Sequence, residues 1–335
     1  MNTIAEVAKR AEVSVATVSR VLNNSAKVSP AARQRVLEAV AALNYHPNAL
    51  GRSLRKSESK MLLVSVPNIS NPYYADIVTG IEDTASAAGY HIMICMTSVG
   101  HNSSKEYAEL LRNGSADGAI TLEVTHDGQG LLEDFAGSRP LVQCCEYCKD
   151  PSVGHVSIDN FAASKQVTEY LLSLGHRRIG FISTKNGYIS TLEREAGFKS
   201  AIESCRDVIY FGIEYADANY NCESGARAAQ AFLSLPEPPT AIFCVSDTVA
   251  IGTIRAATDM GLSVPKDLSV VGFDDVIYAT MFNPELTTVR QPGYELGKCA
   301  CEMLLRQFAG APPEEIFLPH GLIIRGSTAN LPLNK

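Results

Sequence analysis

Five polar and small side chains near the start of the chain are spaced so that they could read DNA. They are Val15, Ala16, Thr17, Ser19 and Arg20. A guanidinium such as that of Arg20 can donate two hydrogen bonds to guanine O6 and N7, and small apolar side chains can contact a thymine methyl group. Hydroxyls such as those of Thr17 and Ser19 suit phosphate oxygens, which position a protein without specifying a sequence. These residue types predict DNA recognition.

A second set of candidate side chains follows apolar runs farther along the chain. The set comprises Tyr73, Tyr74, Asp159, Ser190, Arg194, Tyr220, Ser246 and Asp274. Arg194 and Asp274 can bind ring hydroxyls or a ribose through charge-assisted hydrogen bonds, and the tyrosines can stack on a flat ring or line a sugar face. Asp247, next to Ser246 in CVSDTVA, is a further candidate ligand group. For Asp159 and Asp247 the alternative role is helix capping, and for Tyr73 it is packing across a cleft.

The first candidate set requires two short helices that pack together. Thr3 and Glu6 fit a capping box, and a first helix is expected to end near Glu12–Val13. Ser14 can cap a second helix, and Ser29 followed by Pro30 predicts the start of a third. Apolar residues recur at helical spacing in all three: Ile4, Val7, Ala8 and Ala11; Val18, Val21 and Leu22; Ala32, Val36, Ala39, Val40 and Leu43. So short a turn between two such helices predicts a helix-turn-helix unit, whose second helix enters the major groove.

The charge of the chain is divided in a way that fits this prediction. Residues 1–60 hold ten Lys/Arg against four Asp/Glu, although the whole 335-residue chain has a net charge of −7. A basic head on an acidic body indicates that the head meets a polyanion and the body does not. Chance clustering of charge, or a purely structural helical bundle, are the alternatives.

The second candidate set requires parallel strands that end beside it. From Met61 onward, apolar runs alternate with helical patterns: LLVSVP, HIMICM, AITLEV, LVQCC, RIGFIS, AIFCVS and LSVVGFD. Helices are expected between the strands, for example around 73–88 and 103–113. Such alternation predicts α/β architecture with doubly wound parallel sheets, in two similar subdomains. Ligands of such sheets bind at the carboxyl ends of the strands.

Several stretches carry a resemblance to a known family. TIAEVAKRAEVSVATVSRVLN and NYHPNALGRSL are similar to the headpiece and hinge of the LacI/GalR family of bacterial transcription regulators. VPNISNPYYADIVTGIE, PPTAIFCVSD and LIIRGST resemble the cytidine repressor branch of that family. The resemblance runs from residue 3 to about residue 330. It implies a homodimer that binds a near-palindromic double-stranded operator, and a core of periplasmic-binding-protein type with an effector cleft between its subdomains.

The resemblance assigns boundaries and contacts. It implies a headpiece over 1–46, a hinge over 47–60, an N-subdomain over 61–160 and 291–320, and a C-subdomain over 161–290 and 321–335.

Leu54 occupies the position of a leucine that, in the family, inserts into a central pyrimidine–purine step from the minor groove. Gly51 replaces a common alanine, which weakens the hinge helix. Thr3, Ser14, Asn23 and Asn48 complete the candidate DNA contacts. The second candidate set matches the effector-contacting positions of the family, for a sugar or a nucleoside. Tyr188 stands where the purine-responsive branch carries arginine, so a purine base is not favoured.

Other classes of function are less well supported. The chain lacks GxGxxG, GxxxxGK[ST], HExxH and GxSxG motifs, so we expect no enzyme and no cofactor. Cys145 and Cys148 in QCCEYC could hold a metal or form a disulfide, but no second CxxC or His pair completes a four-ligand site, so no metal is expected. A transporter's solute-binding protein is the alternative function. No apolar run reaches membrane-spanning length and no signal-peptide core precedes the headpiece, so a cytoplasmic location without membrane association is expected.

Overall fold

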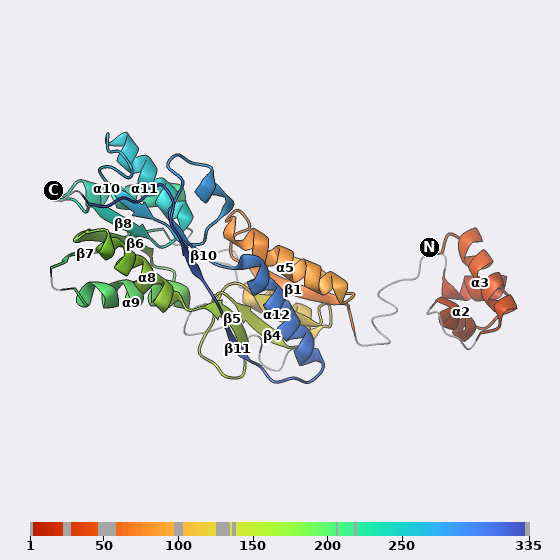
Figure 1. Ribbon diagram of the computed structural model, residues 1–335. Coiled ribbons are helices and arrows are strands. Elements are labelled where there is room, and N and C mark those ends of the chain that lie inside the picture. The colour runs from red at the N-terminus through yellow and green to blue at the C-terminus, as the bar shows by residue number, and fades with distance from the viewer. Residues whose placement is uncertain are drawn as a thin grey trace. The chain divides into compact units, whose positions relative to one another are not determined.

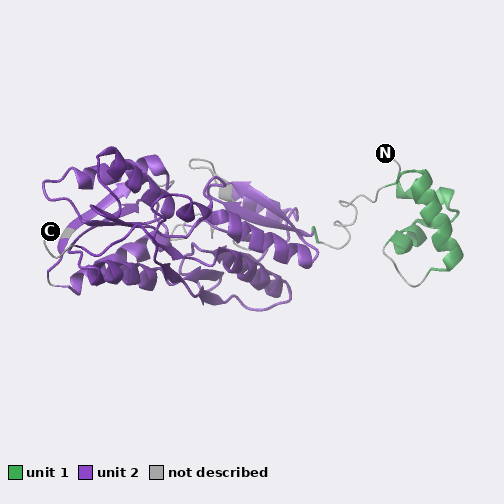
Figure 2. Ribbon diagram, turned by 45° about the horizontal axis from the view of Figure 1, so that its top comes forward, with its two compact units in different colours: residues 1–59 green, residues 60–335 purple. Residues whose placement is uncertain are grey.

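The computed structural model describes residues 3–22, 28–45, 58–96, 103–124, 135, 139–205, 207–217 and 220–331. The chain divides into two compact units, residues 1–59 and residues 60–335 (Figure 2). Each unit has its own hydrophobic core, and each is described separately below.

The first unit is a bundle of three short helices. They are α1 (Ile4–Arg10), α2 (Val15–Leu22) and α3 (Pro30–Ala42). Their predicted apolar stripes meet in one small core: Val7, Ala8, Ala11, Val18, Val21, Val36 and Ala39 are buried. The predicted Ile4 of α1, Leu22 of α2, Ala32 and Val40 of α3, and Leu43 directly after α3 are only partly buried.

The ends of these helices follow local capping chemistry. The capping box of Thr3 and Glu6 is present, and Ser29 caps α3 with Pro30 at the first helical position, as predicted. The first helix, however, ends at Arg10 rather than near Glu12–Val13. Glu12 adopts a left-handed φ of 52°, and the N–H of Val13 donates to the carbonyl of Ala8 at 3.0 Å. This pair of features forms a Schellman motif, which closes the helix two residues early.

The second unit contains two parallel sheets (Figure 1). A six-stranded sheet has the order β11-β5-β4-β3-β1-β2, and a four-stranded sheet has the order β7-β6-β8-β9. The strands of the first sheet are β1 (Met61–Val66), β2 (His91–Met96), β3 (Gly118–Thr121), β4 (Leu141–Cys144), β5 (Gly154–Ile158) and β11 (Glu315–Leu318). Those of the second are β6 (Arg178–Thr184), β7 (Ile209–Ala216), β8 (Ala241–Cys244) and β9 (Ser269–Val271). The α/β architecture with parallel sheets, predicted from the apolar runs, is confirmed.

Helices cover both faces of each sheet. In the first sheet's subdomain, α5 (Tyr73–Ala87) packs against α12 (Gly293–Phe308), and α6 (Ser103–Arg112) contributes to a separate apolar cluster on the other face. In the second, α8 (Asn160–Ser173) pairs with α9 (Ile189–Glu203) below the sheet as drawn in Figure 1, and α10 (Cys222–Leu233) pairs with α11 (Asp247–Asp259) above it.

The chain passes between the two sheets at three places. It leaves the first sheet after β5, returns through β10 (Thr288–Arg290) into α12, and leaves again after β11 for β12 (Gly321–Ile323). β10 and β12 pair antiparallel with each other. This strand membership supports the predicted boundaries near 160, 290 and 320, which remain a proposal. The carboxyl ends of β1, β5, β6, β7, β8 and β9 lead into the segments that carry the candidate side chains of the core.

Candidate nucleic-acid interface and ligand site

The α2 helix presents one face to the core of its unit and the other to solvent. Val18 and Val21 are buried against α1 and α3, whereas Val15, with 40% of its surface exposed, Ala16 and Arg20 face outward. The predicted base-reading side chains therefore stand together on the free side of a helix that a short turn joins to α1. Such a helix can enter a major groove with its first residues toward the bases.

The hydroxyls at the start of α2 bond to each other. Ser14 Oγ accepts from the backbone N–H of Thr17 at 3.2 Å, so Ser14 caps α2 as predicted, and its hydroxyl lies 2.9 Å from that of Thr17. Thr3 Oγ1 likewise serves the capping box of α1. Capping fixes the ends of both helices, and DNA contact by Thr3, Ser14, Thr17 and the half-buried Ser19 stays a prediction. Asn23, Asn48, Gly51 and Leu54 lie outside the described residues.

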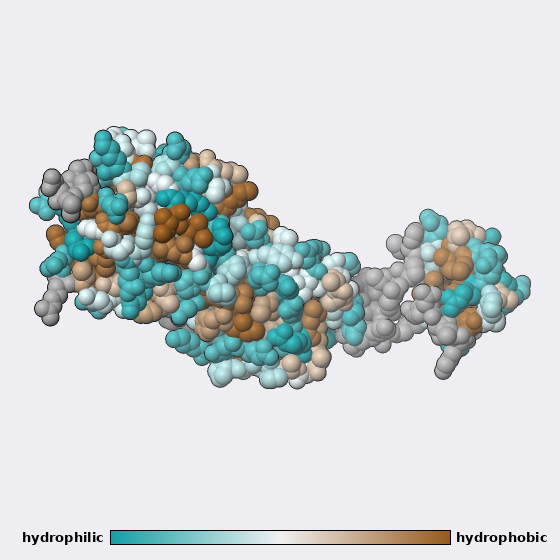
Figure 3. Space-filling view, in the orientation of Figure 1, coloured by the Kyte–Doolittle hydropathy of each residue, from teal (hydrophilic) through white to brown (hydrophobic). Residues whose placement is uncertain are grey.

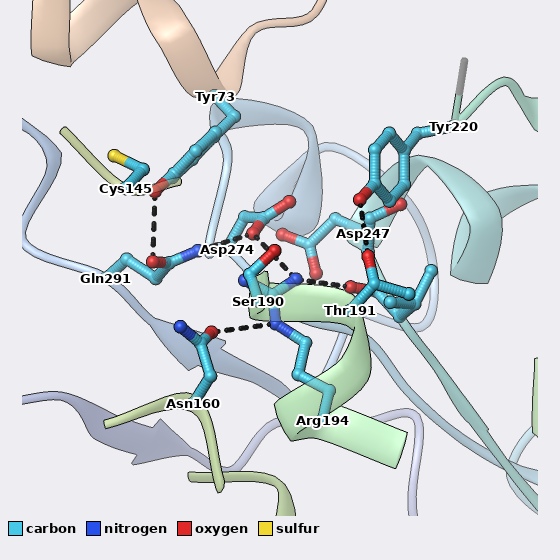
Figure 4. Close-up of polar contacts among 12 residues, drawn as sticks. Tyr73, Cys145, Asn160, Ser190, Thr191, Arg194, Tyr220, Asp247, Asp274 and Gln291 are labelled. Carbon is cyan, nitrogen blue, oxygen red and sulfur yellow. Dashed lines mark hydrogen bonds and ion pairs between the residues drawn. The ribbon is translucent and has the colours of Figure 1, made fainter. Parts of the chain in front are cut away.

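Between the two sheets of the second unit lies a buried group of polar side chains, here called the interdomain cluster (Figure 4). Its members labelled in Figure 4 are Tyr73, Asn160, Ser190, Thr191, Arg194, Tyr220, Asp274 and Gln291. Glu146, which bonds to Ser190, and the neighbouring Tyr74 complete it. Arg194 lies at its centre with 5% of its surface exposed. Its Nε donates to Asn160 Oδ1 at 2.9 Å, and its guanidinium stacks 3.6 Å above the ring of Phe273.

Asp274 contacts both Arg194 and Gln291, and Gln291 directly follows β10, where the chain returns towards the first sheet. Its carboxylate lies 3.9 Å from the guanidinium of Arg194 and accepts a hydrogen bond of 2.7 Å from the amide of Gln291. Burial raises the pKa of Asp274 to about 7, although Arg194 and the Gln291 bond act in the opposite direction. The predicted pair of Arg194 and Asp274 is thus brought together, and Gln291 is a neighbour that the sequence analysis missed.

The backbone that carries Asp274 is held in a strained conformation. Asp274 has a φ of 116° and Asp275 a φ of 57°, a region that side-chain-bearing residues rarely occupy. Asp275 is fixed by Arg325 at 2.6 Å and Arg290 at 2.7 Å. Strain of this kind persists only where surrounding contacts enforce it, and it concentrates at binding sites.

Three predicted tyrosines line the same region. The hydroxyl of Tyr73 donates to Gln291 Oε1 at 3.0 Å, and that of Tyr220 lies 3.0 Å from Thr191 Oγ1. Tyr74 is buried, and burial raises its pKa well above the ordinary value, with smaller effects in the same direction from the neighbouring Tyr220 and Glu146. The rings of Tyr73 and Tyr74 are tilted by 57° with centroids 5.3 Å apart, so neither stacks on the other.

Glu146 is the most important residue that the sequence analysis did not single out. It follows β4 in the first subdomain and accepts hydrogen bonds from the backbone N–H of Ser190, at 3.2 Å, and from the Ser190 hydroxyl. Burial raises the pKa of Glu146 to about 7. The signal was present in QCCEYC, where a carboxylate directly follows a buried strand, but the cysteines of that stretch drew the interpretation instead.

Two more hydrogen bonds join the start of α9 to the first subdomain. The hydroxyl of Tyr188 donates to Glu123 at 2.7 Å, and that of Tyr147 donates to Glu193 at 3.1 Å. Burial raises the pKa of Glu123 and of Glu193. Together with the bonds between Glu146 and Ser190, these contacts fasten one end of α9 across the boundary between the subdomains.

The structure gives two other predicted positions a capping role. Asp159 is exposed and caps α8 by accepting from the N–H of Ala162 at 2.8 Å. The next residue, Asn160, is the one that contacts Arg194. Ser246, not Asp247, caps α11, with its hydroxyl accepting from Val249 N–H. Capping as the alternative role of Asp247 is therefore wrong: its buried carboxylate accepts from Val276 N–H and the Thr288 hydroxyl.

The cysteines of QCCEYC are buried beside this site. The sulfur atoms of Cys144 and Cys145 lie 3.6 Å apart, and Cys148 Sγ accepts from the amide of Gln143. No group of three or more His, Cys, Asp or Glu side chains with the arrangement of a metal site occurs within the described ranges. Nor is any helix in the described part of the chain both long and apolar enough to cross a membrane.

The comparisons with known proteins assign the chain to a family. Residues 3–48 match the bacterial regulatory proteins of the lacI family, and residues 168–328 match the periplasmic binding protein-like domain. The HTH-type transcriptional repressor CytR of Escherichia coli K12 is 37% identical over 333 residues, which cover 98% of this chain and 97% of that protein. The chain therefore belongs to the lacI family of bacterial regulatory proteins.

Solved structures agree with this assignment. A lac repressor dimer bound to operator and the anti-inducer ONPF has a TM-score of 0.87 and 26% identity, and the match covers 98% of this chain and 99% of that one. A lacI-family regulator of Enterococcus faecium with bound ribose has a TM-score of 0.71 and 28% identity, over 81% of this chain and all of that one. The protein is a DNA-binding transcription regulator with an effector-binding core, and the comparisons support a repressor rather than a transporter's solute-binding protein.

Proposed function

We propose that this regulator binds a near-palindromic operator as a homodimer, and that a sugar or nucleoside in the interdomain cluster controls its affinity for DNA. The observation that supports this most strongly is the cluster itself, in which charged and polar side chains of both subdomains meet. Its charged members Glu146, Arg194 and Asp274 are each at most 8% exposed. A related regulator was solved with ribose bound, which supports a ligand of this kind. The role is regulatory rather than catalytic, as it is in the transcriptional regulators that the chain resembles.

The dimer is supported by an exposed apolar surface, here called the η1 patch. It surrounds the short helix η1 (Ile277–Thr280) and consists of Ile277, Tyr278, Met281 and Phe282, which are between 43% and 63% exposed. Figure 3 shows hydrophobic residues gathered in patches on the second subdomain, on the face turned to the viewer. Large apolar side chains exposed close together are typical of protein–protein interfaces, and a related structure is a dimer.

Control by the ligand follows from where the cluster lies. Its side chains belong to both subdomains, so a ligand that binds among them favours one relative arrangement of the subdomains over another. We propose that this arrangement sets the distance between the two hinge segments of a dimer. Leu54 of each subunit then enters a central pyrimidine–purine step, which unstacks easily. The proposal for Leu54, Gly51, Asn23 and Asn48 rests on the sequence alone.

Operator binding can be tested by selecting duplexes from a random library with the full-length chain. The selected sites should contain two half-sites about one helical turn apart. Affinity for them should fall steeply between roughly 50 and 200 mM salt, because phosphate contacts release counterions. A thermal-shift screen of sugars and nucleosides tests the ligand, because a compound that binds only the folded state raises its stability. Sites without symmetry, or affinity that does not change with salt, would refute the proposal.

A further inference from the structure

The hydrogen bonds that join the two subdomains at the start of α9 share one property, which is that each uses a carboxyl group. The pairs, here called the α9 latch, are Tyr188 with Glu123, Tyr147 with Glu193, and Ser190 with Glu146. In each pair one residue belongs to α9 or to its first turn, and the other follows a strand of the first sheet. The bonds of the α9 latch therefore form only while the two subdomains are together.

Glu146 is the most enclosed carboxyl group of the α9 latch, with 7% of its surface exposed. The charged side chains that face it, Glu193 and Arg194, both lie on α9. Arg194 already donates to Asn160 and to the carbonyl of Val245. The other titratable groups around Glu146 are phenols, from Tyr74 on α5, from Tyr147 beside it, from Tyr188 at the start of α9 and from Tyr220 before α10. A negative charge on Glu146 would thus have one cation nearby, and that cation is engaged elsewhere.

The two half-buried carboxyl groups of the α9 latch have their own titratable neighbours. Those of Glu123 are the phenols of Tyr188 and of Tyr107 on α6, and those of Glu193 are Tyr147, Arg194, the exposed Lys149 and the exposed Asp159. The ring of His155 stacks on that of Tyr147, with centroids 3.9 Å apart. Burial lowers the pKa of His155 below 6.5, so the imidazole is neutral at and above neutral pH and supplies no positive charge.

The protonation of these carboxyl groups depends on whether the subdomains are together. Burial raises the pKa of Glu146 to about 7, and it raises the pKa of Glu123 and of Glu193. Separation of the subdomains would return Glu146 to water, where a carboxyl group has its ordinary pKa of about 4.5. A protonated Glu146 keeps its bonds to Ser190 without burying a charge, whereas an ionised one loses its hydration when the subdomains meet. The joined arrangement therefore binds a proton that the separated arrangement releases, and a rise in pH favours separation.

We propose that the α9 latch, and Glu146 above all, makes the contact between the two core subdomains sensitive to pH, so that they are held together at pH 6 and separate more readily at pH 8. A group that titrates near pH 7 in one arrangement and near 4.5 in the other changes the ratio of the two arrangements about tenfold over this range. The inference goes beyond the proposed function, because it needs no ligand and no DNA.

Amide hydrogen exchange on the full-length chain, followed by mass spectrometry at pH 6 and pH 8, measures this separation. The backbone N–H of Ser190 donates to Glu146 across the boundary, so the start of α9 reports it. The start of α10 is the internal reference, because the N–H of Ser224 donates to Asn221 within one subdomain, at 2.8 Å. Dividing each rate by that of an unfolded peptide at the same pH gives a protection factor free of the intrinsic effect of pH. From pH 6 to pH 8, protection at α9 should fall about tenfold or more relative to α10.

Two matched variants assign the effect to Glu146. Glu146→Gln keeps an acceptor for Ser190 but cannot ionise, so its change in protection between the two pH values should be about tenfold smaller than that of the parent. Glu195→Gln changes a carboxyl group on the same helix that accepts from the Ser183 hydroxyl within the second subdomain, at 2.7 Å, and should respond to pH as the parent does. Asp274, whose pKa is also raised to about 7 by burial, is present in all three proteins, so its contribution cancels in the comparison.

Either of two results would overturn the inference. One is a parent chain in which protection at the start of α9 and of α10 changes equally between pH 6 and pH 8, a comparison that requires no variant to fold. The other is a folded Glu146→Gln protein whose protection changes with pH as much as that of the parent. Operator selection measures DNA binding separately, so neither result bears on the proposed function.

Discussion

At the scale of single residues, the exposed Arg20 on α2 carries the clearest sequence-reading chemistry. Arg20→Ala should cost about 1–3 kcal/mol of operator binding and relax the preference at one base pair in each half-site. Arg35→Ala removes an exposed arginine from α3 and serves as the control for charge alone. The measurement is fluorescence anisotropy on a set of duplexes changed one base pair at a time. An equal loss on every duplex would make Arg20 a phosphate anchor instead.

The buried carboxyl of Glu146 makes the stability of the core depend on pH. Its pKa is about 7 in the folded chain, above the ordinary value of 4.5, because it is buried. Between these two pH values the folded state keeps a proton that the unfolded chain has released, so the free energy of unfolding falls as pH rises from about 4.5 to 7. Glu146→Gln removes this loss, which is about 3 kcal/mol at most above pH 7.

Denaturant unfolding at pH 5, 6, 7 and 8 measures this effect. The stability of Glu146→Gln relative to the parent should increase from pH 5 to pH 7 and level off towards pH 8. Glu237→Gln changes an exposed carboxylate and is the matched control. A difference between Glu146→Gln and the parent that stays constant from pH 5 to pH 8 would contradict the assigned protonation.

At the scale of elements, the first subdomain depends on how closely α5 and α12 approach each other. A Cβ atom on Gly297 would lie 1.9 Å from the carbonyl oxygen of Ile77, and one on Gly80 would lie 2.1 Å from that of Tyr294. Gly297→Ala must push the helices apart, and we expect it to lower the free energy of unfolding by about 1–3 kcal/mol. Gly321→Ala meets no atom within 4 Å and should change little. Equal effects of the two substitutions on denaturant unfolding would refute the close-packing account.

The elements also show what the sequence could predict. Continuous apolar runs such as HIMICM and RIGFIS stand out without any tertiary information, and β2 and β6 formed there. β5 was missed because His155 and Ser157 interrupt its apolar pattern, although both are buried in the structure. Its neighbours in the sheet, rather than its own periodicity, make it a strand.

The candidate site was predictable to a similar degree. Arg194 and Asp274 follow from the residue types and from the family resemblance, and the structure brings them together. Glu146, Asn160 and Gln291 were missed because their importance comes from contacts between subdomains, which local spacing does not reveal. Asp159 is the opposite case. Its capping role depends on local spacing alone, so the sequence analysis could give it as an alternative, and the structure shows that Asp159 caps α8.

At the scale of the whole molecule, dimer formation should depend on the η1 patch. Replacing Ile277 and Met281, each more than 60% exposed, with aspartate introduces like charges into the proposed interface. Sedimentation should then show a monomer at micromolar concentration, and operator affinity should fall more than tenfold because the two headpieces bind independently. Leu235→Asp, at an exposed position outside the patch, is the control. A double variant that remains dimeric would place the interface elsewhere.

We propose that a ligand in the interdomain cluster of the second unit controls DNA binding by the first unit. The most direct measurement is operator affinity of the full-length parent and of Asp274→Ala, each with and without a compound found in the thermal-shift screen. We expect equal operator affinity for both proteins without ligand, and a ligand-dependent change in the parent alone. A folded Asp274→Ala protein that still responds to the ligand like the parent would contradict it.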